Sequence, residues 1–378
     1  MSRLLERLGE ELHTWERAGR RRQLAEPDAD NFISNDYLGL SRHPAIRTAV
    51  AEGLNRGLPL GSTGSRLLSG ERTEHRRAEE SFARFVDREA ALLFSSGFAA
   101  NLALLSTIPG RRDLILYDSA VHASLKEGAL GGFAARRAFR HNDVEELRKK
   151  LADREKYRDL FVVVEGVYSM DGDTAPLPMI DQLTRAHDAH LIVDEAHATG
   201  LLGPNLRGAV EAAGVPTPFA TVHPCGKGLG LAGGFIAADQ VVIDYLINAA
   251  RPFIFSTAPS PILSVALERA VSLLPSMKGV AASVLRNADL LREELRRMER
   301  WSVPPGESPI VPVIIGDNNV ASSAAEWLRD RGFDLRAIRP PTVPEGTARL
   351  RITLTADHSE EIARRLAEAI VQCEKEFG

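Results

Sequence analysis

An acid and a histidine stand three positions apart in the segment Asp194-Glu195-Ala196-His197, which directly follows the apolar residues 191–193. In an open α/β sheet, ligands bind just beyond the carboxyl ends of the strands, so this turn is a candidate site. Two kinds of chemistry use such residues. A nucleotide hydrolase of the DEAH type uses the acid to hold Mg²⁺, whereas an enzyme that depends on pyridoxal 5′-phosphate (PLP) uses it to hold the pyridine nitrogen of that cofactor.

The sequence argues against a nucleotide site. A nucleotide hydrolase needs a glycine-rich phosphate loop that ends in Gly-Lys followed by Ser or Thr. The only Gly-Lys pair is Gly226-Lys227, which lies after the acidic turn and is followed by Gly228. A dinucleotide-binding loop is also disfavoured, because the glycine-rich segment 61–66 has no predicted strand before it and no suitable acid after it.

The PLP interpretation needs a lysine that bonds to the cofactor, an acid for the ring nitrogen, a group that stacks on the ring, and a cradle for the phosphate. Lys227 lies between Gly226 and Gly228, and glycine lets the backbone approach a ligand closely. Asp194 would keep the ring nitrogen protonated, because an adjacent anion favours the charged form. His197 lies on the same turn and can reach the ring oxygen.

Two more turns follow predicted strands and supply the remaining parts. Gly97 and Phe98 open a helical stretch after the strand 90–94, and free amides at a helix N-terminus bind phosphate. His122 follows the strand 113–117 and can stack on a ring. Each residue alone also has a structural interpretation, as a helix cap, a buried histidine or a lysine in a turn.

The composition is that of a globular protein with 378 residues, 44% hydrophobic and 26% charged. A net charge of −4 argues against binding to nucleic acid or to a membrane surface, and no apolar run is long enough to span a bilayer. Two cysteines cannot build a disulfide framework, and residues 1–22 form an amphipathic pattern rather than a secretion signal. We therefore expect a cytoplasmic protein, and we expect no metal site.

Alternating helical and strand patterns from about residue 71 predict an α/β fold with a mostly parallel central sheet flanked by helices. The predicted strands cover 90–94, 113–117, 160–165 and 190–194, and the predicted helices cover 75–86, 144–152 and 177–189. Beyond residue 259 we predict helices 261–275, 280–299, 321–331 and 360–376, with strands 310–315 and 348–354. The domains expected are an N-terminal helix and arm over 1–45, a large PLP-binding domain over 46–259, and a small C-terminal α/β domain over 260–378.

Taken together, the segments resemble the α-oxoamine synthase family of fold-type I PLP enzymes over nearly the whole chain. The resemblance rests on residues 34–40, 61–66, 95–101, 122–125, 141–143, 165–173 and 194–200. Within that family, residues 316–318 and 337–353 favour the branch that acts in biotin biosynthesis. The resemblance implies a fold-type I transferase that forms a homodimer, with the active site at the subunit interface.

The resemblance also assigns a role to individual residues. It makes Lys227 the lysine that carries PLP and Asp194 the partner of the ring nitrogen, and it places His197 at the ring oxygen. His122 would stack on the ring. Further cofactor contacts are implied for Gly97, Phe98 and Ser169, and for Ser256 and Thr257, which would reach the phosphate of the partner subunit.

The implied reaction is a decarboxylative condensation of L-alanine with a pimeloyl thioester of coenzyme A or of acyl carrier protein. The amine of Lys227 would remove the Cα proton, and Arg351 would bind the α-carboxylate. Arg20 and Arg339 are expected on the acyl-substrate side. The alternatives are another member of the family, such as glycine C-acetyltransferase, and a non-catalytic PLP-binding homologue, which the intact set of functional residues disfavours.

Two positions depart from the family pattern. Pro224 stands where the family often has a threonine that binds the phosphate, and proline has neither a hydroxyl nor an N–H. His223 or Thr257 of the partner subunit would have to compensate. Ala198 replaces a glycine of the family turn, which restricts the backbone there.

Overall fold

The structure is a computed structural model that describes residues 2–18, 21, 24, 26 and 30–378. Contacts within the chain divide it into two compact units. Unit 1 contains Met1–Ser34, Arg286–Leu354 and His358–Gly378, and unit 2 contains Asn35–Leu285 and Thr355–Asp357. Our domain boundaries at residues 45 and 259 stay a prediction.

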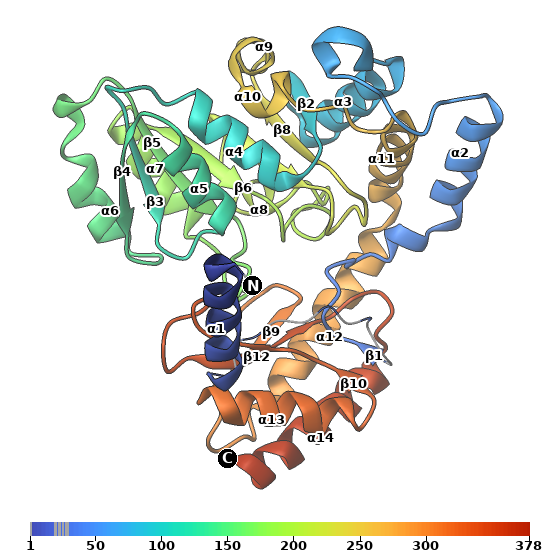
Figure 1. Ribbon diagram of the computed structural model, residues 1–378, viewed down its shortest axis with the longest axis vertical. Helices are drawn as coiled ribbons and strands as arrows, with labels where there is room; N and C mark the ends of the chain where they lie inside the picture. The colour runs from blue at the N-terminus through green and yellow to red at the C-terminus, as the bar shows by residue number, and fades with distance from the viewer. Residues whose placement is uncertain (1, 19–20, 22–23, 25, 27–29) are drawn as a thin grey trace. The chain divides into compact units, whose positions relative to one another are not determined.

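Unit 2 is built on a seven-stranded sheet with the order β2-β8-β7-β6-β5-β3-β4, which confirms the mostly parallel sheet (Figure 1). The strands are β2 (Ala90–Phe94), β3 (Leu114–Asp118), β4 (Ala135–Phe139), β5 (Leu160–Glu165), β6 (His190–Asp194), β7 (Ala220–Pro224) and β8 (Gly234–Ala238). Only β8 runs antiparallel to its neighbours, β2 and β7. The carboxyl ends of the other six strands therefore share one edge of the sheet.

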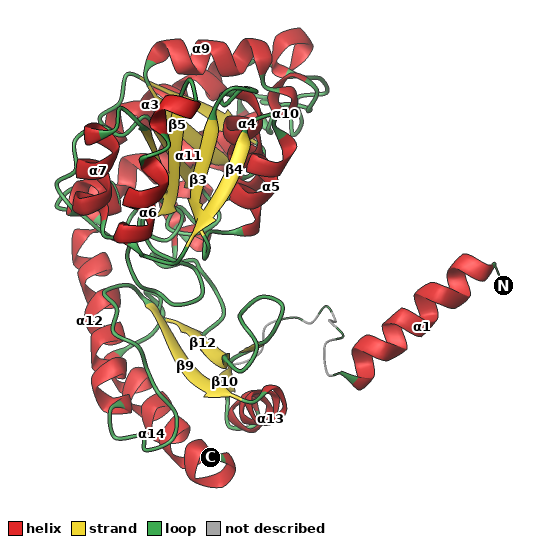
Figure 2. Ribbon diagram, turned by 90° about the vertical axis from the view of Figure 1, so that its left-hand side faces the viewer, coloured by secondary structure: helices red, strands yellow, loops and turns green. Residues whose placement is uncertain are grey.

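Helices flank this sheet on both faces (Figure 2), as a parallel sheet with buried strands requires. Strand β5 is buried at all six positions, and its apolar run Leu-Phe-Val-Val-Val suits a strand covered on both faces. The helices of unit 2 are α2 (Pro44–Asn55), α3 (Thr73–Val86), α4 (Gly97–Thr107), α5 (Ala123–Gly131), α6 (Val144–Leu151), α7 (Leu177–Ala186), α8 (Ala209–Ala212), α9 (Gln240–Ala249), α10 (Arg251–Ile254) and α11 (Pro261–Leu273).

Side-chain caps explain where several helices begin. Ser96 accepts a hydrogen bond from the amide of Ala99 at the start of α4, over 3.1 Å. Asp143 does the same for Glu146 at the start of α6, over 2.8 Å. Such caps satisfy first-turn amides that have no partner within the helix, and each is worth about 1 kcal/mol.

Unit 1 contains a small antiparallel sheet with the order β11-β12-β9, which confirms a smaller C-terminal α/β part. Its strands are β9 (Ile310–Gly316), β11 (Ala337–Ile338) and β12 (Ala348–Thr353), and its helices are α13 (Asn318–Arg329) and α14 (Glu360–Phe377). Strand β1 (Asp30–Asn31) pairs in parallel with β10 (Phe333–Asp334). Helix α12 (Lys278–Leu295) contains the boundary between the two units.

The predicted N-terminal helix forms over Arg3–Arg17 as α1, and it buries no residue. Its apolar face, made of Leu4, Leu5, Leu8 and Leu12, is 41–54% exposed. Across the part of the chain that the structure describes, no helix combines the length and the apolar character needed to cross a membrane.

Candidate active site

Four neighbouring parallel strands end at the candidate site. Lys227 lies three residues after β7, Asp194 ends β6, Glu165 ends β5, and His122 follows β3. The strands are hydrogen-bonded neighbours in that order, so their ends form one row along the sheet edge. The charges of Lys227 and Asp194 both act on the pKa values of His122 and Glu165, which places all four groups within electrostatic range of one another.

Asp194 is a buried carboxylate that accepts hydrogen bonds from two donors. The residue is only 2% exposed, and its Oδ1 accepts a hydrogen bond from the amide of Ala196 over 2.9 Å. Its Oδ2 accepts a hydrogen bond from Nδ2 of Asn101, which lies on α4, over 2.7 Å. Among residues 30–378, no lysine or arginine forms an ion pair with this carboxylate. Because a buried charge needs a counter-charge, the site fits a cationic ring nitrogen beside Asp194.

The glycine after Lys227 brings the lysine loop against the turn that carries His197. A side chain at Gly228 would collide with the carbonyl oxygen of Thr199, so only glycine allows this approach. We expected both flanking glycines to let the backbone approach a ligand. The structure shows that Gly228 makes a contact between two protein loops, while Gly226 is exposed, and a Cβ there would lie 3.9 Å from the carbonyl oxygen of Leu231. The approach of this backbone to a ligand stays a prediction.

His197 is buried and bonded to a residue that the sequence analysis did not single out. Its Nδ1 lies 2.5 Å from the hydroxyl oxygen of Tyr37, and Tyr37 is fully buried. The two rings meet edge to face, with centroids 6.1 Å apart. Ala198, the departure next to it, does not lie in the left-handed region of the backbone, so alanine fits this turn without strain.

His122 caps α5 and is exposed. Its Nδ1 lies 2.8 Å from the hydroxyl of Ser124, and its backbone amide donates to Glu165. The protein atoms packed around the ring lower the pKa of His122; the charge of Asp194 opposes this, and that of Lys227 adds to it. The ring is therefore neutral near pH 7 and open for stacking.

Glu165 is a buried acid for which the sequence analysis proposed no role. Its carboxylate accepts hydrogen bonds from the backbone amides of His122 and Ser169. These bonds hold the two loops that carry His122 and Ser169 at the end of β5. Burial and the charge of Asp194 raise the pKa of Glu165 to about 8, against the two amides and Lys227. Ser169, a predicted cofactor contact, is thereby held near this edge.

The predicted phosphate cradle lies at the start of α4. The first-turn amides, including those of Gly97 and Phe98, have no acceptor within the helix. A side chain at Gly97 would overlap the ring of Pro224, and one at Gly234 would lie 2.7 Å from the Cα of Gly97. Pro224 thus packs directly behind the cradle, which explains why a proline can occupy this position.

His223 does not compensate for the missing hydroxyl. Its ring is buried, with Nδ1 2.8 Å from Thr199 Oγ1 and Nε2 2.8 Å from Thr221 Oγ1. Burial lowers the pKa of His223 to about 3, so the ring is neutral and both nitrogens are already used. Ser256 and Thr257 line a narrow cavity together with Ser95, close to the end of β2.

The predicted substrate arginines belong to unit 1. Arg351 lies in β12, is 8% exposed, and donates from Nη1 to Thr353 Oγ1 over 2.9 Å. Arg339 donates from Nη1 to Ser322 Oγ over 3.0 Å. Arg20 lies outside the described residues. The substrate roles of all three arginines stay predictions.

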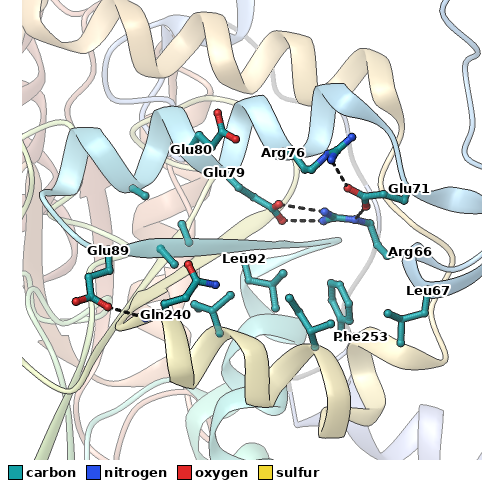
Figure 3. Close-up of a pocket in the computed structure, with 15 residues that line it drawn as sticks. Arg66, Leu67, Glu71, Arg76, Glu79, Glu80, Glu89, Leu92, Gln240 and Phe253 are labelled. Atoms are coloured by element: carbon teal, nitrogen blue, oxygen red, sulfur yellow. Dashed lines mark hydrogen bonds and ion pairs between the residues drawn. The ribbon is translucent and has the colours of Figure 1, made fainter.

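A cavity of about 400 Å³ lies elsewhere in unit 2, between α3, β2 and α9, and contains none of the predicted site residues (Figure 3). Several of its polar groups pair with one another. Arg66 makes two parallel hydrogen bonds to Glu79, over 2.7 and 3.0 Å, and a third to Glu71. Glu79 also accepts the amide of Leu93 on the edge strand β2. The hydrogen bonds of Arg66 to the two glutamates therefore anchor the segment 61–70.

Comparison with known proteins identifies related chains. Residues 28–370 match the family described as aminotransferase class I and II. A putative 8-amino-7-oxononanoate synthase 2 of Bacillus velezensis is 40% identical, over 92% of this chain and 89% of its own length. The 8-amino-7-oxononanoate synthase of Aromatoleum aromaticum is 41% identical, over 94% of each chain.

Two solved structures have the same fold. Serine palmitoyltransferase from S. paucimobilis, with a bound PLP–myriocin aldimine, has a TM-score of 0.92 and 29% identity, and the match covers 100% of both chains. The 8-amino-7-oxononanoate synthase of Francisella tularensis has a TM-score of 0.79 and 27% identity, over 91% of this chain and 97% of its own.

Proposed function

This chain belongs to the aminotransferase class I and II family, and from that premise we propose that it condenses L-alanine with a pimeloyl thioester to give 8-amino-7-oxononanoate, CO₂ and the free carrier. PLP is its cofactor. The observation that carries the proposal is the buried carboxylate of Asp194, which has no ion-pair partner among residues 30–378, beside Lys227 and His122. The named activity of the relatives supplies the substrates.

When bound, PLP supplies an electron-withdrawing ring that stabilises negative charge at the amino acid Cα. Asp194 would hold the ring nitrogen, and the first-turn amides of α4 would hold the phosphate. Lys227 would take the proton from Cα, a role that needs an uncharged amine. His122, neutral and exposed, would cover the open face of the ring.

The arginines of unit 1 would serve the substrates. We assign the α-carboxylate of alanine to Arg351, because a guanidinium binds a carboxylate through two parallel hydrogen bonds. Arg339 would serve the acyl side, with Arg20. Arg339 also lines a cavity of about 350 Å³ with Arg329 and Arg336. Four arginines and two glutamates line this cavity, and its net positive charge suits the phosphate that both coenzyme A and acyl carrier protein carry, so either can be the donor.

We further propose that the chain acts as a homodimer in a reducing compartment such as the cytoplasm. Four large apolar side chains of unit 2 are 49–85% exposed, namely Leu60, Leu67, Leu68 and Phe255. Exposed apolar side chains of this size are typical of protein interfaces. Ser256, next to Phe255, would then face the phosphate of the partner subunit. Both cysteines are free and buried, which suits a reducing environment.

A matrix of steady-state assays tests the function. Alanine, glycine and serine are each combined with pimeloyl-, acetyl- and palmitoyl-coenzyme A and with pimeloyl-acyl carrier protein. Release of the free thiol gives the rate, and mass spectrometry identifies the product. We expect the highest kcat/KM for alanine with a pimeloyl thioester. A higher kcat/KM for glycine with acetyl-coenzyme A, or for serine with palmitoyl-coenzyme A, would assign the chain to another reaction of the family.

A further inference from the structure

A continuous chain of hydrogen bonds joins the two predicted cofactor contacts His122 and Asp194. Nδ2 of Asn101 donates to Asp194 Oδ2 over 2.7 Å and to Ser124 Oγ over 2.9 Å. Oγ of Ser124 lies 2.8 Å from His122 Nδ1. Asn101 and Ser124 are each 1% exposed, so water does not compete for these bonds. Neither residue was singled out in the sequence.

The orientation of the Asn101 amide is fixed by the carboxylate. An ionised carboxylate only accepts hydrogen bonds, so the NH₂ group of Asn101 must face Asp194. The opposite orientation would set two oxygen atoms against each other. In this orientation the buried Oδ1 of Asn101 has no hydrogen-bond partner among the described residues, which lowers the stability of the folded protein.

The donor directions then determine where His122 carries its proton. Ser124 Oγ accepts from Asn101, so its own hydrogen is available for His122 Nδ1. The backbone amide of Ser124 points at the same nitrogen over 3.2 Å and can only donate. With two donors aimed at it, Nδ1 must be the unprotonated nitrogen of a neutral ring.

We propose that Asn101 and Ser124 are positioning residues that fix His122 as a neutral ring with its proton on Nε2, and that the same Asn101 amide holds Asp194. The groups whose charges face His122 are Asp194, Lys227 and Lys126, and their effects partly cancel. The ring cannot turn over without losing both bonds to Nδ1. Its Nε2–H is therefore presented in one orientation.

This inference depends on the proposed function in one respect only, which is the identity of the group that the Nε2–H of His122 contacts in the site. One amide orients both the group beneath the ring nitrogen and the group on the ring face. A change at Asn101 should therefore weaken cofactor affinity and disturb His122 together. A change at Ser124 should disturb His122 alone, because Ser124 does not contact Asp194.

Nitrogen NMR of the PLP-free protein, labelled with ¹⁵N-histidine, measures the tautomer directly. The signals of His122 are assigned by their absence in His122→Gln. We expect a protonated Nε2 and an unprotonated Nδ1 at pH 7. Losing one hydrogen bond to Nδ1 should change the tautomer ratio about fivefold in Ser124→Ala, and in Asn101→Ala by a similar factor. Ser264→Ala is the matched control, because Ser264 is fully buried and lies on α11.

Cofactor binding separates the two positions. Titration with PLP should show an affinity at least about fivefold lower for Asn101→Ala, a smaller loss for Ser124→Ala, which disturbs only His122, and no change for the control. A wild-type His122 with its proton on Nδ1 or with two protons would overturn the proposal. So would an unchanged tautomer ratio in both Ser124→Ala and Asn101→Ala. Because the NMR readout needs neither cofactor nor substrate, its outcome is independent of whether the assays support the proposed condensation.

Discussion

Replacing His141 by glutamine should remove the ion pairs that link the loop after Asp118 to the loop that contains Asp173. His141 Nδ1 lies 3.0 Å from Asp118 Oδ1, and Nε2 lies 2.9 Å from Asp173 Oδ2. Asp118 ends β3 and accepts the amides of Ala120 and Asn142, both over 2.8 Å. Burial alone would lower the pKa of His141, but the hydrogen bonds and charges of the two aspartates raise it to about 10.

The sign of the pH dependence follows from that shift. The folded protein holds the proton of His141 more tightly than the unfolded chain, whose histidine has a pKa near 6.5. The stabilisation is therefore full below about pH 6.5 and is lost as the pH rises towards 10. The shift corresponds to about 5 kcal/mol at most. Because the side chain is 31% exposed, we expect roughly half of that after solvent screening.

Urea unfolding of the PLP-free protein at several pH values provides the assay. His141→Gln should be less stable than the wild type by about 2 to 3 kcal/mol at pH 6, with a difference that shrinks steadily up to pH 10. His13→Gln is the control, because His13 is 76% exposed and 3.8 Å from Glu16, and exposed pairs contribute little. A difference that does not vary between pH 6 and pH 10 would refute the reasoning, as would an NMR titration of His141 near pH 6.5.

Three further substitutions test the site. Lys227→Ala should lose the covalent link to PLP, so borohydride reduction followed by peptide mass spectrometry should label Lys227 only in the wild type. Tyr37→Phe removes the 2.5 Å contact to His197 and should lower kcat about tenfold, the effect of one good hydrogen bond; an unchanged kcat would exclude a role for Tyr37. Gly97→Ala forces a methyl group into Pro224 and should cost about 1 to 3 kcal/mol, seen as a lower urea midpoint, together with weaker PLP binding in a titration.

The strongest elements of the fold were predictable from the sequence. Strands β2, β5 and β6 are short apolar runs with clear ends, and they form over the predicted residues. Strand β4 was not predicted, because it is an edge strand whose sequence Ala-Arg-Arg-Ala-Phe has mostly exposed positions and no apolar alternation. Strand β7 was not predicted either, since it is short and ends in Pro224.

The site was predictable only where a residue follows a strand. Asp194, Lys227 and His122 stand out because a polar group after an apolar run marks the binding edge of a sheet. Asn101 and Tyr37 lie in segments that contributed to the family resemblance, yet their partners are 93 and 160 residues away in sequence. Spacing along the chain carries no signal for such pairs, because only the folding of the chain brings them together.

Two neighbouring acids, Glu165 and Asp194, determine the electrostatics of this sheet edge. Glu165 and Asp194 end adjacent strands as buried acids, and two carboxylates in such surroundings do not both ionise readily. Burial and the charge of Asp194 raise the pKa of Glu165. Asn101 and Ala196 each donate one hydrogen bond to the carboxylate of Asp194. A cation bound beside Asp194 would therefore lower the pKa of Glu165, because it would weaken the repulsion between the two carboxylates.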